Sequence, residues 1–195
     1  YNKWKNELNI DYEMRTSHII ENEVKGSVII SGGTANIHPV WSPGEKRFAF
    51  LSNKDQDGFG QTDLFYYNFP DSSSNKIVEG VHTAPTWIND STIVYTKRSK
   101  PNKWGSRFFD LYVFTFSDEK EKRLTFDSRL ISPIYDSISN KIFAINSYDG
   151  TSNIMISSKI DLNKEKIEFQ PLTRLENGMH LLSLSLIKGD LYVDG

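Results

Sequence analysis

The sequence predicts an all-β protein, a partial β-propeller of four-stranded antiparallel blades, preceded by one amphipathic helix. The composition favours strands, because the 195 residues contain only four alanines against 12 Phe, 9 Tyr and 4 Trp. A segment of about 47 residues also repeats along the chain. Each complete copy contains four short runs of strand-like composition, which is the strand count of one propeller blade.

The N-terminal residues have a helical periodicity. Trp4, Leu8 and Tyr12 recur every four positions, Tyr1 extends the same stripe, and charged residues fill the other faces. We therefore expect one amphipathic helix over residues 3 to about 20, within a linker segment at 1–22. After this segment, glycine and proline separate runs that are too short for helices.

The strand that opens each unit has the clearest repeat, in which proline is followed two residues later by an aromatic residue. The equivalent positions are Trp41, Trp87, Tyr135 and, in a worn copy, Leu184. A later strand begins at Asp63, Asp110 and Asn153. These matches predict a partial propeller over residues 23–195, with repeats at about 38–80, 81–126 and 127–175 and a partial repeat at 178–195.

The second and third strands of each unit are apolar on both faces, as in residues 48–51 and 112–116. A blade that packs between two neighbours buries both faces of its sheet, so its strands are continuously apolar rather than alternating. This pattern favours stacked blades over a sheet with one face in water.

The repeat resembles that of the TolB-like (WD40-like, PD40) propellers over residues 25 to 195. Pro39-Val-Trp41-Ser-Pro43 is the strongest copy, and Arg123-Leu-Thr125 and Asp149-Gly-Thr-Ser-Asn153 fit their places. Gly44-Glu45 departs from the Asp-Gly of the family, and the second and third units lack the Ser-Pro step. The arrangement is most similar to multidomain bacterial envelope proteins, in which a helix rich in Trp and Tyr joins an upstream zinc-peptidase-like domain to the propeller. The resemblance implies partner binding in a periplasmic or extracytoplasmic location.

The length predicts an incomplete ring. At about 47 residues a blade, the chain supplies three complete blades and a partial one, whereas propellers close with four to eight. We expect two open faces rich in aromatic residues. The sequence therefore predicts either a fragment of a larger protein or closure by self-association.

Charge and motifs exclude several classes of function. With 23 Lys and Arg against 25 Asp and Glu, bulk charge does not favour nucleic-acid binding. The chain has no cysteine, and no run approaches the roughly 18 apolar residues of a membrane span. His-Glu-x-x-His, Gly-x-Ser-x-Gly and P-loop motifs are absent. We therefore predict no catalytic residues in this chain and no membrane insertion.

Three histidines lie near the start of inner strands. His38 and His82 come shortly before a proline that opens such a strand, and His180 is similarly placed. Because inner-strand starts line one mouth of a propeller channel, these side chains could converge on a ligand or a metal ion. The alternative interpretation is that they are ordinary polar residues on loops.

One loop has the spacing of a calcium site. Asn53, Asp55 and Asp57 alternate before Gly58, with Asp63 further along. Leu64 stands where an EF-hand has its bidentate glutamate, so an EF-hand is excluded. The alternative is an ordinary hairpin loop, which prefers the same residues. No other cofactor is indicated.

A basic loop over residues 97–107 contains Trp104 and Arg107. It resembles a patch for an acidic ligand, and both residue types favour protein interfaces. The alternative is a solvated loop between two strands of one blade.

These observations favour a non-catalytic binding or scaffolding module for protein or peptide partners. An alternative is an accessory propeller that gates substrate for a hydrolase or peptidase whose catalytic domain lies outside this chain. A stand-alone propeller enzyme would need convergent carboxylates or a metal. The inner-strand residues Val40, Thr86, Ile134 and Ser183 offer neither.

Overall fold

The computed structural model describes the chain except for residues 59, 148–149, 177–182, 188 and 195. The chain divides into two compact units, Tyr1–Ser31 and Gly32–Gly195. The first contains helix α1 (Asn2–Glu21), and the second contains the strands that the structure describes.

Helix α1 spans Asn2–Glu21 and confirms the predicted helix, with one more residue at each end. Trp4, Leu8 and Tyr12 lie on one side of it, and none of its residues is buried. Ile10 is also exposed and, at 3.6 residues per turn, lies on the opposite side, so the apolar residues are not confined to one face. Among the described residues, no helix combines the length and apolarity needed to cross a membrane.

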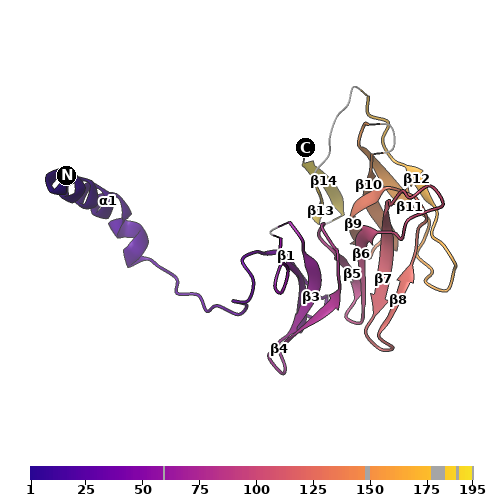
Figure 1. The fold of residues 1–195 in the computed structure, drawn as a ribbon, viewed down its shortest axis with the longest axis horizontal. Coiled ribbons are helices and arrows are strands. Elements are labelled where there is room, and N and C mark those ends of the chain that lie inside the picture. The colour runs from indigo at the N-terminus through magenta and orange to yellow at the C-terminus, as the bar shows by residue number, and fades with distance from the viewer. Residues whose placement is uncertain (59, 148–149, 177–182, 188, 195) are drawn as a thin grey trace. The chain divides into compact units, whose positions relative to one another are not determined.

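The second unit consists of three four-stranded antiparallel sheets and one hairpin (Figure 1). The first sheet contains β1 (Asn36–Trp41), β2 (Arg47–Ser52), β3 (Asp63–Asn68) and β4 (Ser73–Val78). The second contains β5 (Thr86–Asn89), β6 (Thr92–Arg98), β7 (Phe109–Thr115) and β8 (Lys120–Arg123). The third contains β9 (Leu130–Asp136), β10 (Lys141–Asn146), β11 (Asn153–Ser157) and β12 (Phe169–Pro171). The hairpin pairs β13 (Ser183–Ile187) with β14 (Asp190–Asp194). Each sheet follows chain order, as the sequence repeat predicts.

Successive sheets pack face to face and bury a separate core in each interface. Strand β6 shows the arrangement, because its residues alternate between two cores. Ile93 and Tyr95 pack with residues of the first sheet, whereas Val94 packs with residues of the third. All three side chains are fully buried. This confirms that the middle strands bury both of their faces, which explains their continuous apolar character.

An Asp or Asn at or next to the start of the third strand of each sheet ties that strand to the segment leading to the next repeat. In each case a side-chain oxygen accepts a hydrogen bond from a backbone amide of that segment. The bonds join Gly80 N to Asp63 Oδ1 (3.0 Å), Ser128 N to Asp110 Oδ1 (2.9 Å) and Leu175 N to Asn153 Oδ1 (2.7 Å). A repeated Asp or Asn therefore has a structural role at this position.

The first sheet has an exposed aromatic surface. Trp41 is 53% exposed, and its ring stacks on Phe69 with centroids 5.2 Å apart. The equivalent Trp87 of the second sheet is only 5% exposed, because it packs in the core shared with the first sheet. This difference agrees with the expected open face on the first blade. Self-association, or completion by further blades, stays a prediction.

Candidate functional site

Two inner strands have β-bulges at their proline residues. The register between β1 and β2 shifts at His38-Pro39, and that between β9 and β10 shifts at Ser132-Pro133. Proline has no backbone N–H, so it cannot donate to the ladder at these points. His38 (φ 54°) and Ser132 (φ 50°) take up the left-handed conformation, which is uncommon outside glycine. A bulge of this kind turns the side chain away from the regular pleat.

The inner-strand starts converge on one pocket of about 170 Å³, which we call the mouth pocket. Strands β1, β9 and β13 and the segment before β5 contribute to it. Its lining residues are His38, His82, Thr83, Ala84, Ser132, Pro133, Ser183 and Leu184. The structure therefore brings His38 and His82 to the same pocket, from the segments that open the first two repeats. His180 lies outside the described residues.

The mouth pocket offers hydroxyl and imidazole groups. The Oγ1 atoms of Thr83 and Thr96 lie 2.5 Å apart, and the backbone N–H of Ser132 donates to Thr83 Oγ1 at 3.4 Å. The His82 ring meets the ring of Phe109 edge to face, at 6.2 Å between centroids. No carboxylate is among the described residues that line the pocket. Sequence reasoning singled out the histidines but missed Thr83 and Ser132, although both lie just before a repeated proline.

A second and larger pocket, which we call the basic pocket, lies beside the mouth pocket. It has a volume of about 470 Å³, and His82 lines both pockets. Its lining residues are Glu79, Gly80, His82, Lys97, Arg98, Ser99, Lys100, Pro101, Arg107, Tyr112 and Glu121. Of the two residues proposed for the basic loop, only Arg107 lines it. Trp104 is 78% exposed at the loop tip, where the Lys103 ammonium lies 5.0 Å from its ring centroid.

The predicted calcium loop lines a third pocket. One of its three expected ligands, Asn53, already accepts hydrogen bonds from the backbone. Asn53 Oδ1 accepts hydrogen bonds from the backbone amides of Thr34 and Ala35, both at 2.9 Å. Asp55 and Asp57 also line this pocket, and both are exposed. Among the described residues, no group of three or more His, Asp or Glu side chains could hold a metal ion. Asn53 therefore holds the chain before β1, which favours the alternative of an ordinary hairpin loop over the calcium site.

Calorimetric titration with Ca²⁺ would test the loop directly. We expect no saturable heat below about millimolar Ca²⁺, because only two carboxylates remain available and Ca²⁺ takes six to eight oxygen ligands. A saturable heat that disappears in Asp55→Ala would contradict this expectation and support a calcium site. Lys54→Ala, in the same loop, serves as the control because it removes no carboxylate.

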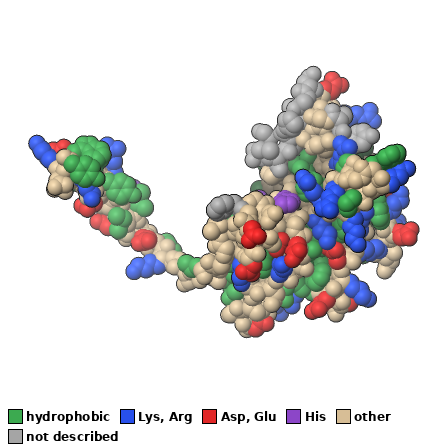
Figure 2. Space-filling model, in the orientation of Figure 1, with side chains coloured by type: hydrophobic (Ala, Val, Ile, Leu, Met, Phe, Trp, Pro, Cys, Tyr) green, Lys and Arg blue, Asp and Glu red, His purple; other side chains and the backbone are tan. Residues whose placement is uncertain are grey.

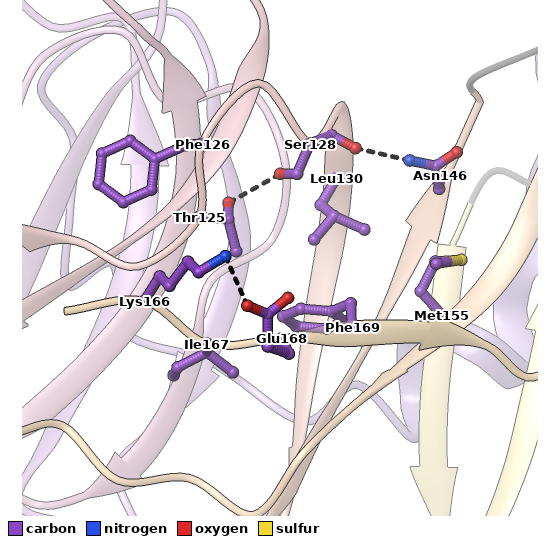
Figure 3. A pocket seen from close by; sticks show the side chains of 10 residues that line it. All are labelled: Thr125, Phe126, Ser128, Leu130, Asn146, Met155, Lys166, Ile167, Glu168 and Phe169. Carbon is purple, nitrogen blue, oxygen red and sulfur yellow. Dashed lines mark hydrogen bonds and ion pairs between the residues drawn. The ribbon is translucent and has the colours of Figure 1, made fainter. Parts of the chain in front are cut away.

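A fourth pocket of about 240 Å³ is lined by the segment that joins the second and third sheets, by strands of the third sheet and by the segment that leads into β12 (Figure 3). Its polar groups point toward one another and form hydrogen bonds. Ser128 Oγ donates to Thr125 Oγ1 at 2.7 Å, and Asn146 Nδ2 donates to Ser128 O at 2.6 Å. Lys166 pairs with Glu168 at 2.6 Å, and this hydrogen bond raises the pKa of Lys166. We interpret this pocket as a structural joint between blades. No sequence motif marks it, because its residues come from distant segments.

Comparison with known proteins bears on the fold. No protein-family model matches the sequence, and no curated protein matches it. Solved structures do match. TolB from Acinetobacter baumannii aligns with a TM-score of 0.63 at 16% identity, over 85% of this chain and 39% of that one. The chain has a β-propeller fold.

Other propellers align comparably. The putative TolB from Agrobacterium tumefaciens gives a TM-score of 0.56 at 17% identity, over 75% of this chain and 50% of that one. A prolyl endopeptidase structure gives 0.60 at 11% identity, over 87% of this chain and 26% of that one. The chain spans half or less of each of these three structures. At such identities the likeness shows the fold alone, and at that level the predicted resemblance to TolB-like propellers is confirmed.

Proposed function

We propose that this propeller is a non-catalytic binding or scaffolding module that takes up a segment of a protein or peptide partner at the mouth pocket. The observation that carries the proposal is the convergence of the segments that open the four successive repeats. His38, Thr83, Ser132 and Ser183 come from four successive repeats and line one pocket. The likeness to TolB, together with the TolB-like repeat, supports a periplasmic or extracytoplasmic location.

The size of the mouth pocket indicates how such a partner would bind. A volume of about 170 Å³ is below the range of about 300–1,000 Å³ typical of pockets that enclose a small molecule. It suits a single side chain of a longer segment. The hydroxyl and imidazole groups can both donate and accept hydrogen bonds, which fits a peptide backbone crossing the pocket. We therefore expect one anchoring residue in the mouth pocket, with the rest of the segment over the surrounding loops.

A second candidate is an accessory propeller that orients substrate for a hydrolase or peptidase domain located outside this chain. The likeness to a prolyl endopeptidase propeller favours it, with a TM-score of 0.60. Both candidates require a segment to occupy the mouth. They differ in what happens to the bound segment. A binding module releases it unchanged, whereas an accessory propeller presents it to the catalytic domain for cleavage.

Filling the mouth pocket should abolish peptide binding. Ala84 is half-buried and lines the pocket, so Ala84→Phe places a ring in that space. Peptides selected from a random phage library against the wild-type protein should bind Ala84→Phe at least about tenfold more weakly, a loss of roughly 1.4 kcal/mol. Fluorescence anisotropy with the selected peptides would measure the dissociation constants.

The matched control is Ile138→Phe, which enlarges a side chain that is 82% exposed in the β9–β10 turn, away from the mouth. It should leave the dissociation constants unchanged. The proposal fails if no peptide is enriched over background, or if the selected peptides bind Ala84→Phe as tightly as the wild type.

A further inference from the structure

We infer that the basic pocket is an anion-selective subsite that holds an acidic segment of the peptide partner next to the mouth pocket. The inference rests on the proposed function, because the two pockets would be occupied by one chain. It adds the chemical class of that partner, a peptide with clustered carboxylates.

The charges that line the basic pocket do not cancel. Both of its carboxylates already have cationic partners, since Glu79 pairs with Lys76 at 2.8 Å and Glu121 pairs with Lys97 at 2.5 Å. Glu121 also accepts a hydrogen bond from the hydroxyl of Tyr95 at 2.5 Å. Both carboxylates of the pocket are therefore already paired with groups of the protein itself.

Three further cations line the pocket without an ion pair. Among the described residues, no carboxylate lies within 4.0 Å of a cationic nitrogen of Arg98, Lys100 or Arg107. In Figure 2, Lys and Arg side chains gather beside a histidine near the middle of this face. Concave surfaces lined by charge of one sign focus the electrostatic field and concentrate ions of the opposite sign.

The loop that carries two of these cations is held in place by hydrogen bonds. Ser99 N donates to Phe108 O at 2.8 Å, which closes the base of the loop beside Lys100 and Arg107. Asn102 Oδ1 accepts two backbone amides of the loop tip, at 2.9 and 3.0 Å. The cations are therefore attached to an ordered backbone, which lowers the entropic cost of binding.

The ring contact of Arg98 positions the third cation. Its guanidinium carbon lies 5.1 Å from the centroid of Phe109, in β7. A guanidinium oriented by a ring keeps its N–H donors free for a carboxylate, which it can bind with two parallel hydrogen bonds. Phe109 also contacts His82, which lines both pockets. A peptide anchored in the mouth pocket would therefore meet the basic pocket at His82.

The size and net charge favour a peptide over other anions. A pocket of about 470 Å³ is larger than one phosphate ion requires and suits two or three acidic side chains. The whole chain has a formal charge of −2, so it lacks the bulk positive charge that dominates nucleic-acid binding.

Binding of rhodamine-labelled hexaglutamate to the whole 195-residue chain, followed by fluorescence anisotropy, tests the inference. We expect saturable binding that weakens as NaCl rises from about 50 to about 300 mM. Lys100→Gln/Arg107→Gln should bind about tenfold more weakly, because two charge-assisted hydrogen bonds are lost. Lys120→Gln/Lys159→Gln removes the same charge from exposed positions outside the pocket and should bind as the wild type does.

The possible outcomes distinguish an acidic peptide from the other anions that could bind, phosphate and nucleic acid. Equal binding by the two double variants, or no binding of hexaglutamate, overturns the inference. So does binding of hexaglutamine with the affinity of hexaglutamate, or full competition by inorganic phosphate at the same concentration as the peptide. Tighter binding of a six-nucleotide oligothymidylate would assign the pocket to nucleic acid instead. Ala84→Phe tests the mouth pocket separately, so selected peptides that depend on Ala84 while hexaglutamate fails to bind would leave the proposed function intact.

Discussion

Replacing Asp110 with alanine is expected to lower the free energy of unfolding by about 3 kcal/mol. The carboxylate is fully buried, and it pairs with the guanidinium of Arg123 at 2.6 Å. It also accepts hydrogen bonds from the backbone amides of Asp127 and Ser128 and from the hydroxyl of Thr125. Alanine would remove the acceptor that these donors share, and the segment between the second and third sheets would lose its attachment.

Chemical denaturation would measure this loss of stability. Two further variants provide a control and separate the contribution of the ion pair from that of the hydrogen bonds. Asp118→Ala, in the turn between β7 and β8, removes an exposed carboxylate that lies 3.8 Å from Lys120, and it should change stability by less than about 0.5 kcal/mol. Asp110→Asn keeps an acceptor oxygen but loses the ion pair, so its effect should be intermediate. If Asp110→Ala costs no more than Asp118→Ala, the carboxylate does not hold the blades together.

Replacing Trp87 with alanine is expected to cost about 3–5 kcal/mol, as is usual for a buried aromatic side chain. The indole packs between the first and second sheets and stacks on Phe116 with centroids 5.5 Å apart. Its Nε1 also donates to the carbonyl oxygen of Val40, at 2.9 Å, across the two sheets. The change would therefore open a cavity and remove a hydrogen bond between blades.

The repeat supplies the control for this experiment. Trp41 occupies the equivalent position in the first sheet but is 53% exposed, so Trp41→Ala should cost about 1 kcal/mol. Chemical denaturation of both variants at several protein concentrations would compare them. Equal costs would contradict the expected difference between the two positions. A cost for Trp41→Ala that grows with protein concentration would show that another copy of the chain covers this surface.

The order of the strands could be predicted from the sequence because the local motifs and the apolar runs recur in the same order in each repeat. Pro39-Val-Trp41 and Pro85-Thr-Trp87 mark the same strand in two units, and the apolar runs after them mark the strands that bury both faces. The repeat also places His38 and His82 before the first strands of two successive units, and both residues line one pocket. Because repeated segments fold into repeated units, similarity between two segments predicts that they occupy corresponding places in the fold.

The details of the sites could not be predicted, because they depend on contacts between distant residues. The spacing around Asn53 is that of an ion ligand, but its oxygen is bound to amides about 18 residues upstream. The composition of the basic loop also could not distinguish Trp104 from Arg107. The turn built around Asn102 decides which of them reaches the pocket. Local spacing does not report such contacts.

The prolines of the inner strands have a consequence for solubility. Among the described strands, β1, β5 and β9 each pair along one side only, which leaves a row of backbone groups open to strand addition from another chain. Pro39 and Pro133 have no backbone N–H, and the bulges bend two of these strands at the prolines. The bulges at His38-Pro39 and Ser132-Pro133 therefore have a second effect. They protect these strand edges against pairing with strands of another molecule. A variant selected at these positions for tighter binding should consequently be screened for aggregation as well.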